Sequence, residues 1–237
     1  MDAPERNGTR TTVTQRAIEQ IKSKIAAGEL RPGQRLPTER DLAAELGLSR
    51  NSMREAIRAL TVMGVLEARH GAGIYVTRLE PKDLLETFGV VAEISRGSSL
   101  IDLLRVRRIL EPAATAIAAA RIDEATLETV RSHLDRMAHC ERVEDFVAAD
   151  LAFHQTIVGA AGNPALEAIV AGLSTRTFRA RVWRGQRDSG AIPRMRLEHE
   201  RIYRALLARD PEAARAAAAV HIGEVEDWLR NNIDSIG

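Results

Sequence analysis

Residues Leu36–Val76 read LPTERDLAAELGLSRNSMREAIRALTVMGVLEARHGAGIYV and decide the fold of the first part of the chain. Thr38 follows a proline and is a typical N-cap for a helix that stops at Gly47. Ser49 begins a second helix, which ends at Gly64 and carries apolar residues at helical spacing along one face. The stretch therefore predicts two helices joined by a tight turn.

Two short segments rich in strand-forming residues follow the second helix. Val65–Ala68 and Ile74–Val76 flank a glycine-rich turn at Arg69–Gly73, which is the pattern of a two-stranded ribbon. A short helix, a turn and a second helix have the size of a unit that reads the DNA major groove, and the ribbon would lie along the phosphates. Residues 12–78 are therefore predicted to form a winged helix-turn-helix.

Arginines recur every fourth residue on another face of the second helix, at Arg50, Arg54 and Arg58. Such a stripe can equally be a solvated helix face. The helix caps, the glycine-bounded turn and the basic wing tip together favour DNA binding, because the N-terminal residues of a recognition helix face base edges. The predicted DNA contacts lie on these elements: Arg40, Ser49, Arg50, Asn51, Ser52, Arg54, His70 and Gly71.

The length, the composition and the uneven distribution of charge are compatible with two domains, of which only the first is expected to bind DNA. The chain has 237 residues, of which 45% are hydrophobic and only 3% aromatic, so its cores should be aliphatic and helical. Residues 1–78 hold 13 Lys and Arg against 9 Asp and Glu, a net charge of +4. Residues 79–237 hold 21 against 24, a net charge of −3. The basic part is the part predicted to bind DNA.

Cysteine content and hydropathy predict a cytoplasmic protein. Cys140 is the only cysteine, so no intrachain disulfide is possible, and a reducing compartment fits. Residues 1–11 are polar, are expected to be flexible and lack the apolar centre of a signal peptide. The chain contains no apolar run of 18 residues, so no membrane association is expected.

The sequence after Pro81, which marks a linker at residues 79–83, has a helical pattern throughout. Pro112 falls inside one of the expected helices and should kink it. We predict a mainly α fold in which an antiparallel seven-helix bundle, residues 84–233, follows the winged domain. Its helices are expected at 84–94, from Ser98 or Ser99 to about Arg121, at 123–140, 143–160, 165–183 and 193–208, and from Asp210–Pro211 to about Asn232.

Histidine placement carries the chemistry of this second domain. Asp150 and His154 share one helix face at i, i+4, and His199 and His221 lie on the last two helices. One carboxylate and three imidazoles facing a bundle core suit a divalent transition metal. Each histidine alone could instead be a satisfied or surface residue, and Asp150 with His154 could be a helix-stabilising pair. The two remaining histidines of this domain sit in a charge-rich helix and are expected at the surface: His133 and His139.

The motifs resemble a known family of bacterial regulators. GEL-x-PG-x-x-LP-x-ER-x-LA, SR-x-x-x-REA and HG-x-G-x-x-V, which together cover Gly28–Val76, are similar to the DNA-binding domain of the GntR family. R-x-x-LE at Arg107–Glu111, D-x-x-FH at Asp150–His154, GN at 162–163, EH at 198–199 and AA-x-x-x-H ending at His221 resemble the FCD effector domain of the FadR-type branch.

The resemblance implies a metal on Asp150, His154, His199 and His221, since many FCD domains hold one on these motif positions. Zinc is the first expectation, and nickel, manganese or iron would also suit the ligands. The helix expected at 84–94 resembles the seven-helix version of the domain. Relatives of this kind sense small carboxylic or sugar acids.

A small organic acid is therefore the expected effector. A carboxylate could bind the metal and a bidentate arginine together, and Arg107 is placed to supply the arginine. Arg176, Arg179 and Trp183 on the expected fifth helix are further candidates for lining the pocket, although they could equally be surface residues.

These inferences predict a homodimeric transcriptional regulator, a repressor in preference to an activator, that binds a palindromic operator. Two recognition helices on one palindrome roughly add their binding free energies.

In an alternative to this prediction, the metal ion itself is the signal to which the regulator responds. A more distant alternative is a metal-dependent enzyme, because three histidines and an aspartate also occur at catalytic centres. The chain has no convincing general base, and a hydrolase would have no use for the N-terminal domain.

Overall fold

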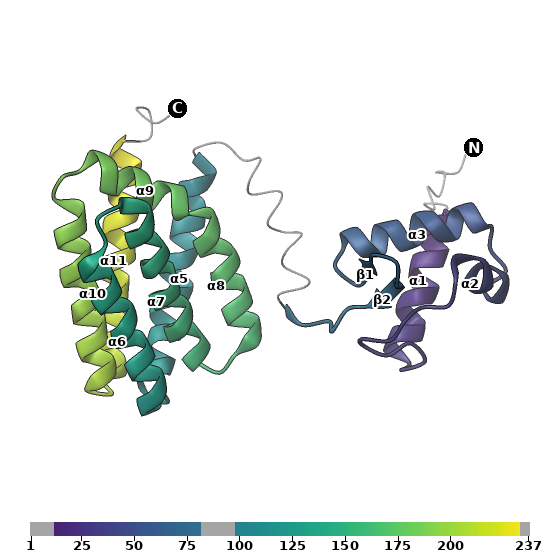
Figure 1. Cartoon of the computed structure of the whole chain (residues 1–237), viewed down its shortest axis with the longest axis horizontal. Helices are drawn as coiled ribbons and strands as arrows, with labels where there is room; N and C mark the ends of the chain where they lie inside the picture. The colour runs from purple at the N-terminus through teal and green to yellow at the C-terminus, as the bar shows by residue number, and fades with distance from the viewer. Residues whose placement is uncertain (1–11, 82–97, 233–237) are drawn as a thin grey trace, which may run out of the picture. The chain divides into compact units, whose positions relative to one another are not determined.

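The computed structural model describes residues 12–81 and 98–232 (Figure 1). The chain separates into two compact units, Met1–Thr87 and Phe88–Gly237, and each is described by itself. The N-terminal segment at 1–11, the end of the linker at 82–83 and the helix expected at 84–94 lie outside the described residues.

The first unit is a winged helix-turn-helix, as predicted. Thr38 and Ser49 cap two of its helices, and their hydroxyls accept hydrogen bonds from the backbone N–H of Asp41 (3.2 Å) and Ser52 (3.0 Å). Its elements are α1 (Val13–Ala26), α2 (Glu39–Glu45), α3 (Arg50–Val62), β1 (Leu66–Arg69) and β2 (Gly73–Val76).

The wing is an antiparallel pair in which Leu66 lies opposite Val76 and Arg69 opposite Gly73. Sequence reasoning missed a short third segment, since Arg35 bridges to Tyr75 beside the ribbon. The inward side chains of the wing join those of α1, α2 and α3 in one core. This core fixes the recognition helix α3 and the wing on one rigid unit.

The second unit is helical throughout its described part. In it, α5 lies along α11, α6 along α7, and α10 along α11 (Figure 1). Pro112 lies inside α5, as expected. The seven helices of residues 98–232 are α5 (Ser98–Ala119), α6 (Glu124–His139), α7 (Val143–Ala160), α8 (Pro164–Arg176), α9 (Phe178–Arg187), α10 (Ala191–Leu207) and α11 (Pro211–Asn232).

One helix boundary differs from the prediction. The helix expected over 165–183 is broken at Thr177, which ends α8 and precedes α9, and α9 occupies part of the loop expected before residue 193. The Thr177 hydroxyl donates to the carbonyls of Leu173 and Ser174, both at 3.2 Å, in the last turn of α8. This local bonding competes with helix continuation. The buried side chains nevertheless keep a helical spacing across this break, at Ser174, Thr177, Arg181 and Arg184.

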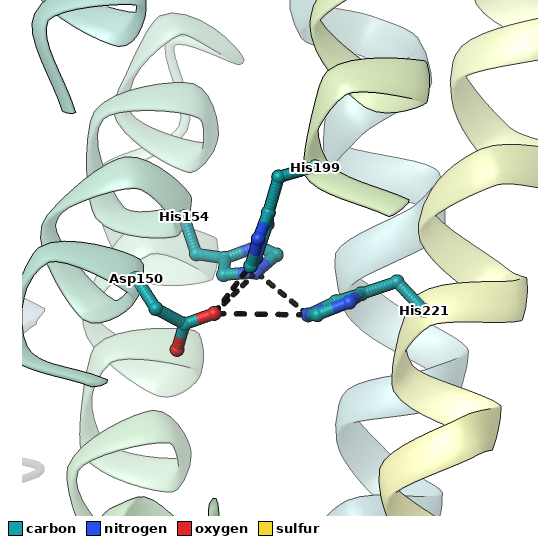
Figure 2. Close-up of side chains that lie close together, drawn as sticks. All are labelled: Asp150, His154, His199 and His221. Atoms are coloured by element: carbon teal, nitrogen blue, oxygen red, sulfur yellow. Dashed lines mark hydrogen bonds and ion pairs between the residues drawn. The ribbon is translucent and has the colours of Figure 1, made fainter. Parts of the chain in front are cut away.

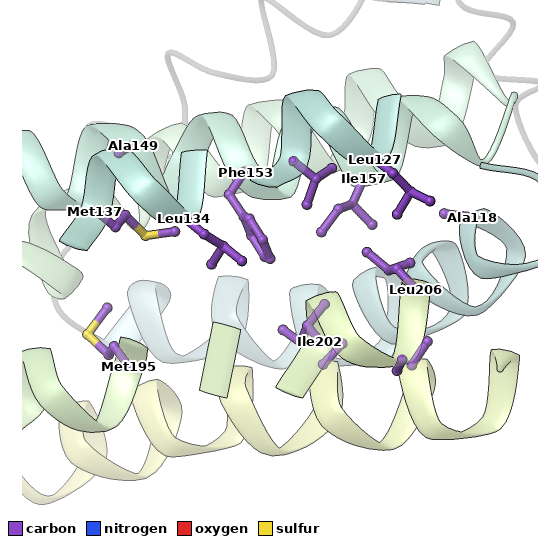
Figure 3. Packing of buried hydrophobic residues seen from close by; sticks show 14 of the residues in the cluster. Ala118, Leu127, Leu134, Met137, Ala149, Phe153, Ile157, Met195, Ile202 and Leu206 are labelled. Carbon is purple, nitrogen blue, oxygen red and sulfur yellow. The ribbon is translucent and has the colours of Figure 1, made fainter. Parts of the chain in front are cut away.

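The main core of the second unit lies between α6, α7 and α10 (Figure 3). Phe153 on α7 is fully buried, and its ring packs edge-on against the imidazoles of His154 and His199, with centroid distances of 5.3 and 5.0 Å. The same apolar core that holds the helices together therefore also limits the movement of two of the histidine rings.

Candidate metal centre

The structure brings the aspartate and the three histidines together in the interior of the second unit (Figure 2). Asp150 and His154 come from α7, His199 from α10 and His221 from α11. Each offers one ligand atom, and these atoms all lie within 4.8 Å of one another. All four side chains are buried. The helix-stabilising pair considered for Asp150 and His154 is thus only one edge of a larger cluster.

The ligand atoms converge on a common point. Asp150 Oδ1 lies 2.8 Å from His199 Nε2, 3.5 Å from His154 Nε2 and 3.8 Å from His221 Nε2. The Nε2 atoms of His154 and His221 are 3.1 Å apart. Within the described ranges, Asp150 Oδ1 and His199 Nε2 have no hydrogen-bond partner of good geometry. Buried polar atoms without partners are rare, and a shared cation would satisfy both.

Two carboxylates outside the cluster face imidazole Nδ1 atoms, and one of them is within hydrogen-bond distance. His221 Nδ1 lies 2.8 Å from Glu198 Oε2, and His154 Nδ1 lies 3.6 Å from Glu111 Oε2. An imidazole that donates through Nδ1 keeps the Nε2 lone pair free for a metal. Glu111 and Glu198 belong to the R-x-x-LE and EH motifs, yet sequence reasoning gave neither of them a role.

Burial keeps these imidazoles neutral. Desolvation lowers the pKa of His221 well below its ordinary value and also lowers the pKa of His154. Burial raises the pKa of Glu198, the acceptor for His221. A neutral imidazole is the form that ligates a metal, so two of the three histidines are already in the form required for binding.

Arg181 forms a buried ion pair with the aspartate of the cluster. It is fully buried on α9, donates through Nη1 to Asp150 Oδ2 and through Nη2 to the Ser174 carbonyl at 2.7 Å. Burial alone would raise the pKa of Asp150, but the Arg181 charge and the adjacent imidazoles of His154 and His199 hold it well below its usual range. Asp150 is thus a carboxylate whose Oδ2 faces arginine and whose Oδ1 faces the histidines.

Arg107, the arginine expected to reach the effector, is engaged elsewhere. Its Nε and Nη2 donate to the two carboxylate oxygens of Glu111, the latter at 3.1 Å, and its Nη1 donates to Thr177 Oγ1 at 2.7 Å. Arg107 therefore anchors Glu111 behind His154. Its guanidinium is already bonded on each of its three nitrogens.

The other expected pocket residues are not among the four residues of the cluster. Arg179 is exposed on α9, and its guanidinium stacks over the ring of half-buried Trp183 at 5.2 Å; Arg176, at the end of α8, is also half-buried. The charged residues of α9 that turn inward are instead Arg181 and Arg184. No sequence signal that we used singled out this pair.

The two remaining histidines of this domain differ from each other. His139 is exposed, as expected. His133 is half-buried and lies 3.2 Å from Thr156 Oγ1 through Nε2, so its assignment to the surface was only partly right. Neither residue belongs to the cluster.

The residues expected to contact DNA lie on the accessible surface of the first unit. All of them are exposed except Ser52, which is half-buried next to its cap, Ser49. Arg54 Nε bonds Glu39 Oε2 at 3.0 Å, so the guanidinium is held across the gap between α3 and α2. The exposed set is Arg40, Ser49, Arg50, Asn51, Arg54, His70 and Gly71.

Comparison with known proteins agrees with both halves of this description. Residues 13–76 match the family described as bacterial regulatory proteins, gntR family, and residues 102–224 match the FCD domain. In the parts of the chain that the structure describes, no helix is long and apolar enough to cross a membrane.

Individual relatives are similar over most of their length. The chain is 33% identical to the HTH-type transcriptional regulator LutR of Bacillus subtilis, over 86% of this chain and 95% of that protein. It is 30% identical to the galactonate operon transcriptional repressor of Escherichia coli, over 88% and 93%. A solved structure, Streptococcus agalactiae GntR, covers 90% of this chain and 99% of its own with a TM-score of 0.61 and 25% identity.

Proposed function

The chain belongs to the GntR family of bacterial transcriptional regulators and carries an FCD domain, and we propose that it is a homodimeric repressor whose operator affinity is controlled by a small acid at a metal centre. That it is a DNA-binding regulator and not an enzyme follows from the family. The metal, the acid, the dimer and the direction of regulation are the parts proposed here.

The buried cluster of Asp150, His154, His199 and His221 is the observation that carries the proposal. One oxygen and three nitrogen donors suit zinc, nickel, manganese or iron. Ions that take six ligands would keep two positions for an effector carboxylate beyond these four. Glu198 bonds His221 Nδ1 and leaves its Nε2 toward the cluster, and Glu111 lies 3.6 Å from His154 Nδ1, which supports a metal over a purely structural cluster.

A repressor that responds to an acid is supported by the type of relative. The name of the galactonate operon repressor states both a repressor role and a sugar-acid operon for that protein. An acid that binds one conformation of the helical unit more tightly would shift the population of conformations, and with it the affinity of the winged units for DNA. A homodimer would place two recognition helices on the two halves of a palindromic operator.

Metal binding is tested by measuring the metal content and thermal stability of purified protein. His199→Ala combined with His221→Ala should remove one equivalent of divalent ion per chain and lower the melting temperature measured in the presence of metal, because metal stabilises only the folded state. His133→Ala, which changes a histidine outside the cluster, should do neither. Retention of a full equivalent by the double variant would show that the ion sits elsewhere.

DNA recognition is tested by gel-shift titration on the operator. Arg50 and Arg54 project from the start of α3, and losing either should cost about 1–3 kcal/mol of binding if it makes a bidentate contact to guanine. Arg58→Ala is the matched control, because that residue lies a turn further along α3 and pairs with Glu55 at 3.1 Å. Parent-like binding by a variant that lacks both Arg50 and Arg54 would contradict the assignment.

The alternative in which the metal is the signal makes a different prediction for the same assay. If the ion alone controls DNA binding, loading the stripped protein with metal should release or restore the operator complex without any acid. The proposed mechanism requires an acid for release from DNA when the metal is already bound.

A further inference from the structure

The helix α9 carries buried cationic N–H groups that lack acceptors. Arg181 and Arg184 are 0% and 1% exposed. Among the residues that the structure describes, Arg181 Nε and both Nε and Nη1 of Arg184 have no hydrogen-bond partner. Arginine stays protonated in proteins, so these N–H groups belong to charged side chains and are removed from water without an acceptor. Such groups are costly unless an anion completes them.

Both arginines adjoin the metal centre. Arg181 donates to Asp150 Oδ2, the carboxylate oxygen that is not the proposed metal ligand. Glu198, which bonds His221, lies close enough to Arg184 to act on its charge. The ion pair of Arg184 itself, with Glu224 at 3.6 Å, is loose, and the Glu224 side chain is 51% exposed. The unpartnered donors therefore lie beside the candidate metal ligands and not at a separate site.

The charge of this interior shows what kind of anion would fit. Three buried arginines, including Arg107, face three buried acids, namely Asp150, Glu111 and Glu198. A divalent ion on the four ligands would add two positive charges to this set, for which Glu224, 3.6 Å from Arg184 and half-exposed, is only a loose partner. An anion with a second charge would compensate this interior more fully than a monocarboxylate, because uncompensated charge in a buried site is strongly unfavourable.

We infer that Arg181 and Arg184 receive a second anionic group of the effector, so that the effector is a small dicarboxylate. This inference rests on the proposed function, because it assigns the first carboxylate of the acid to the metal. The second carboxylate accepts hydrogen bonds from Arg184 Nε and Nη1 and from Arg181 Nε. A guanidinium presents such donors in a planar fork that matches a carboxylate. Arg107 keeps its role of anchoring Glu111.

The test compares each dicarboxylate with its own half-amide, which has the same shape and one charge fewer. Malonate and malonamate, and succinate and succinamate, are titrated calorimetrically into metal-loaded full-length protein. The parent should bind at least one dicarboxylate about tenfold or more tighter than its half-amide, as loss of a hydrogen bond to a charged group implies. Arg184→Met should bring this ratio close to one, because it weakens the dicarboxylate far more than the uncharged half-amide.

Arg179→Met is the matched control, since it removes an exposed arginine from the same helix. It should keep the parental ratio. Arg184→Lys takes the place of Arg184→Met if that variant does not fold. It keeps the charge in a smaller head group that lacks the planar fork, and it should also reduce the ratio. A parent ratio near one for both pairs, or an undiminished ratio in the folded Arg184 variants, would overturn the inference.

Failure of the proposed function has a separate signature. If chelation leaves the affinity of every acid unchanged while the ratio still depends on Arg184, the metal does not hold the acid but the arginine site stands. If chelation weakens both members of a pair equally and the ratio is one, the metal site stands and the arginine site falls. If neither pair binds the metal-loaded parent, both are wrong.

Discussion

Replacing Glu198 by glutamine should weaken metal binding without removing any metal ligand. Glu198 Oε2 accepts a hydrogen bond from His221 Nδ1 at 2.8 Å, and its side chain is buried. Glutamine has nearly the same shape and can still accept this bond through its carbonyl oxygen. What it removes is the negative charge that makes the imidazole more basic and offsets the charge of the ion.

The size of the expected loss in metal affinity follows from what outer carboxylate partners of ligating histidines contribute in other metal sites. Losing an outer carboxylate partner of a ligating histidine typically lowers metal affinity about 10–100-fold. This is about 1.4–2.7 kcal/mol of binding free energy. At a fixed metal concentration well above the dissociation constant, the same amount is lost from the stability of the loaded protein. For a domain of this size, each kcal/mol shifts the melting temperature by about 2–4 °C, so a drop of about 3–10 °C is expected.

The assay is a chelator competition together with melting curves of stripped and loaded protein. Glu200→Gln is the matched control, because Glu200 lies on the same helix but bonds Arg204 at its outer face. The stripped Glu198→Gln protein should melt close to the stripped parent, so that the loss appears only with metal. An unchanged metal affinity, or an equal loss in stripped and loaded protein, would refute the role of Glu198 in orienting His221.

Three further variants test what holds the second unit together. Phe153→Ala should cost about 3–5 kcal/mol in denaturant unfolding, since it empties the core beside the histidine rings. Asp123→Ala should cost only about 1 kcal/mol, because it removes the cap that accepts from the Thr126 N–H at 2.7 Å. Arg181→Met should destabilise metal-free protein by about 3–5 kcal/mol, since it leaves Asp150 buried and unpaired, and metal should recover part of that loss.

The winged unit could be predicted because its decisive interactions are local. The caps at Thr38 and Ser49 each bond a backbone N–H three residues away, and the glycines at the ends of α2 and α3 adopt positive φ, 63° at Gly47 and 71° at Gly64. Such signals lie within a few residues of one another, so the sequence pattern contains them. The short pairing of Arg35 with Tyr75 joins distant segments, and it was missed.

The four candidate ligands were also accessible from the sequence, although by a different route. Only the i, i+4 spacing of Asp150 and His154 is a local signal. That His199 and His221 join them depends on how α10 and α11 pack in the bundle, and the family motifs supplied that information. The roles of Glu111 and Glu198 follow from distances of 3.6 and 2.8 Å to histidine ring nitrogens, which no spacing rule provides.

The buried arginines of α9 show where local reasoning stops. An α-helix advances about 100° per residue, and the buried side chains Ser174, Thr177, Arg181 and Arg184 keep that spacing across the break between α8 and α9. Thr177 ends α8 with its hydroxyl on two carbonyls of the last turn, and that hydroxyl also accepts from Arg107, 70 residues earlier in the chain. Arg181 can then be buried because Asp150, on another helix, neutralises it. Helical spacing alone does not say whether the face with Arg179 or the face with Arg181 and Arg184 is buried; contacts remote in sequence decide this, and the ion pair of Arg181 with Asp150 joins α9 to the candidate metal ligands.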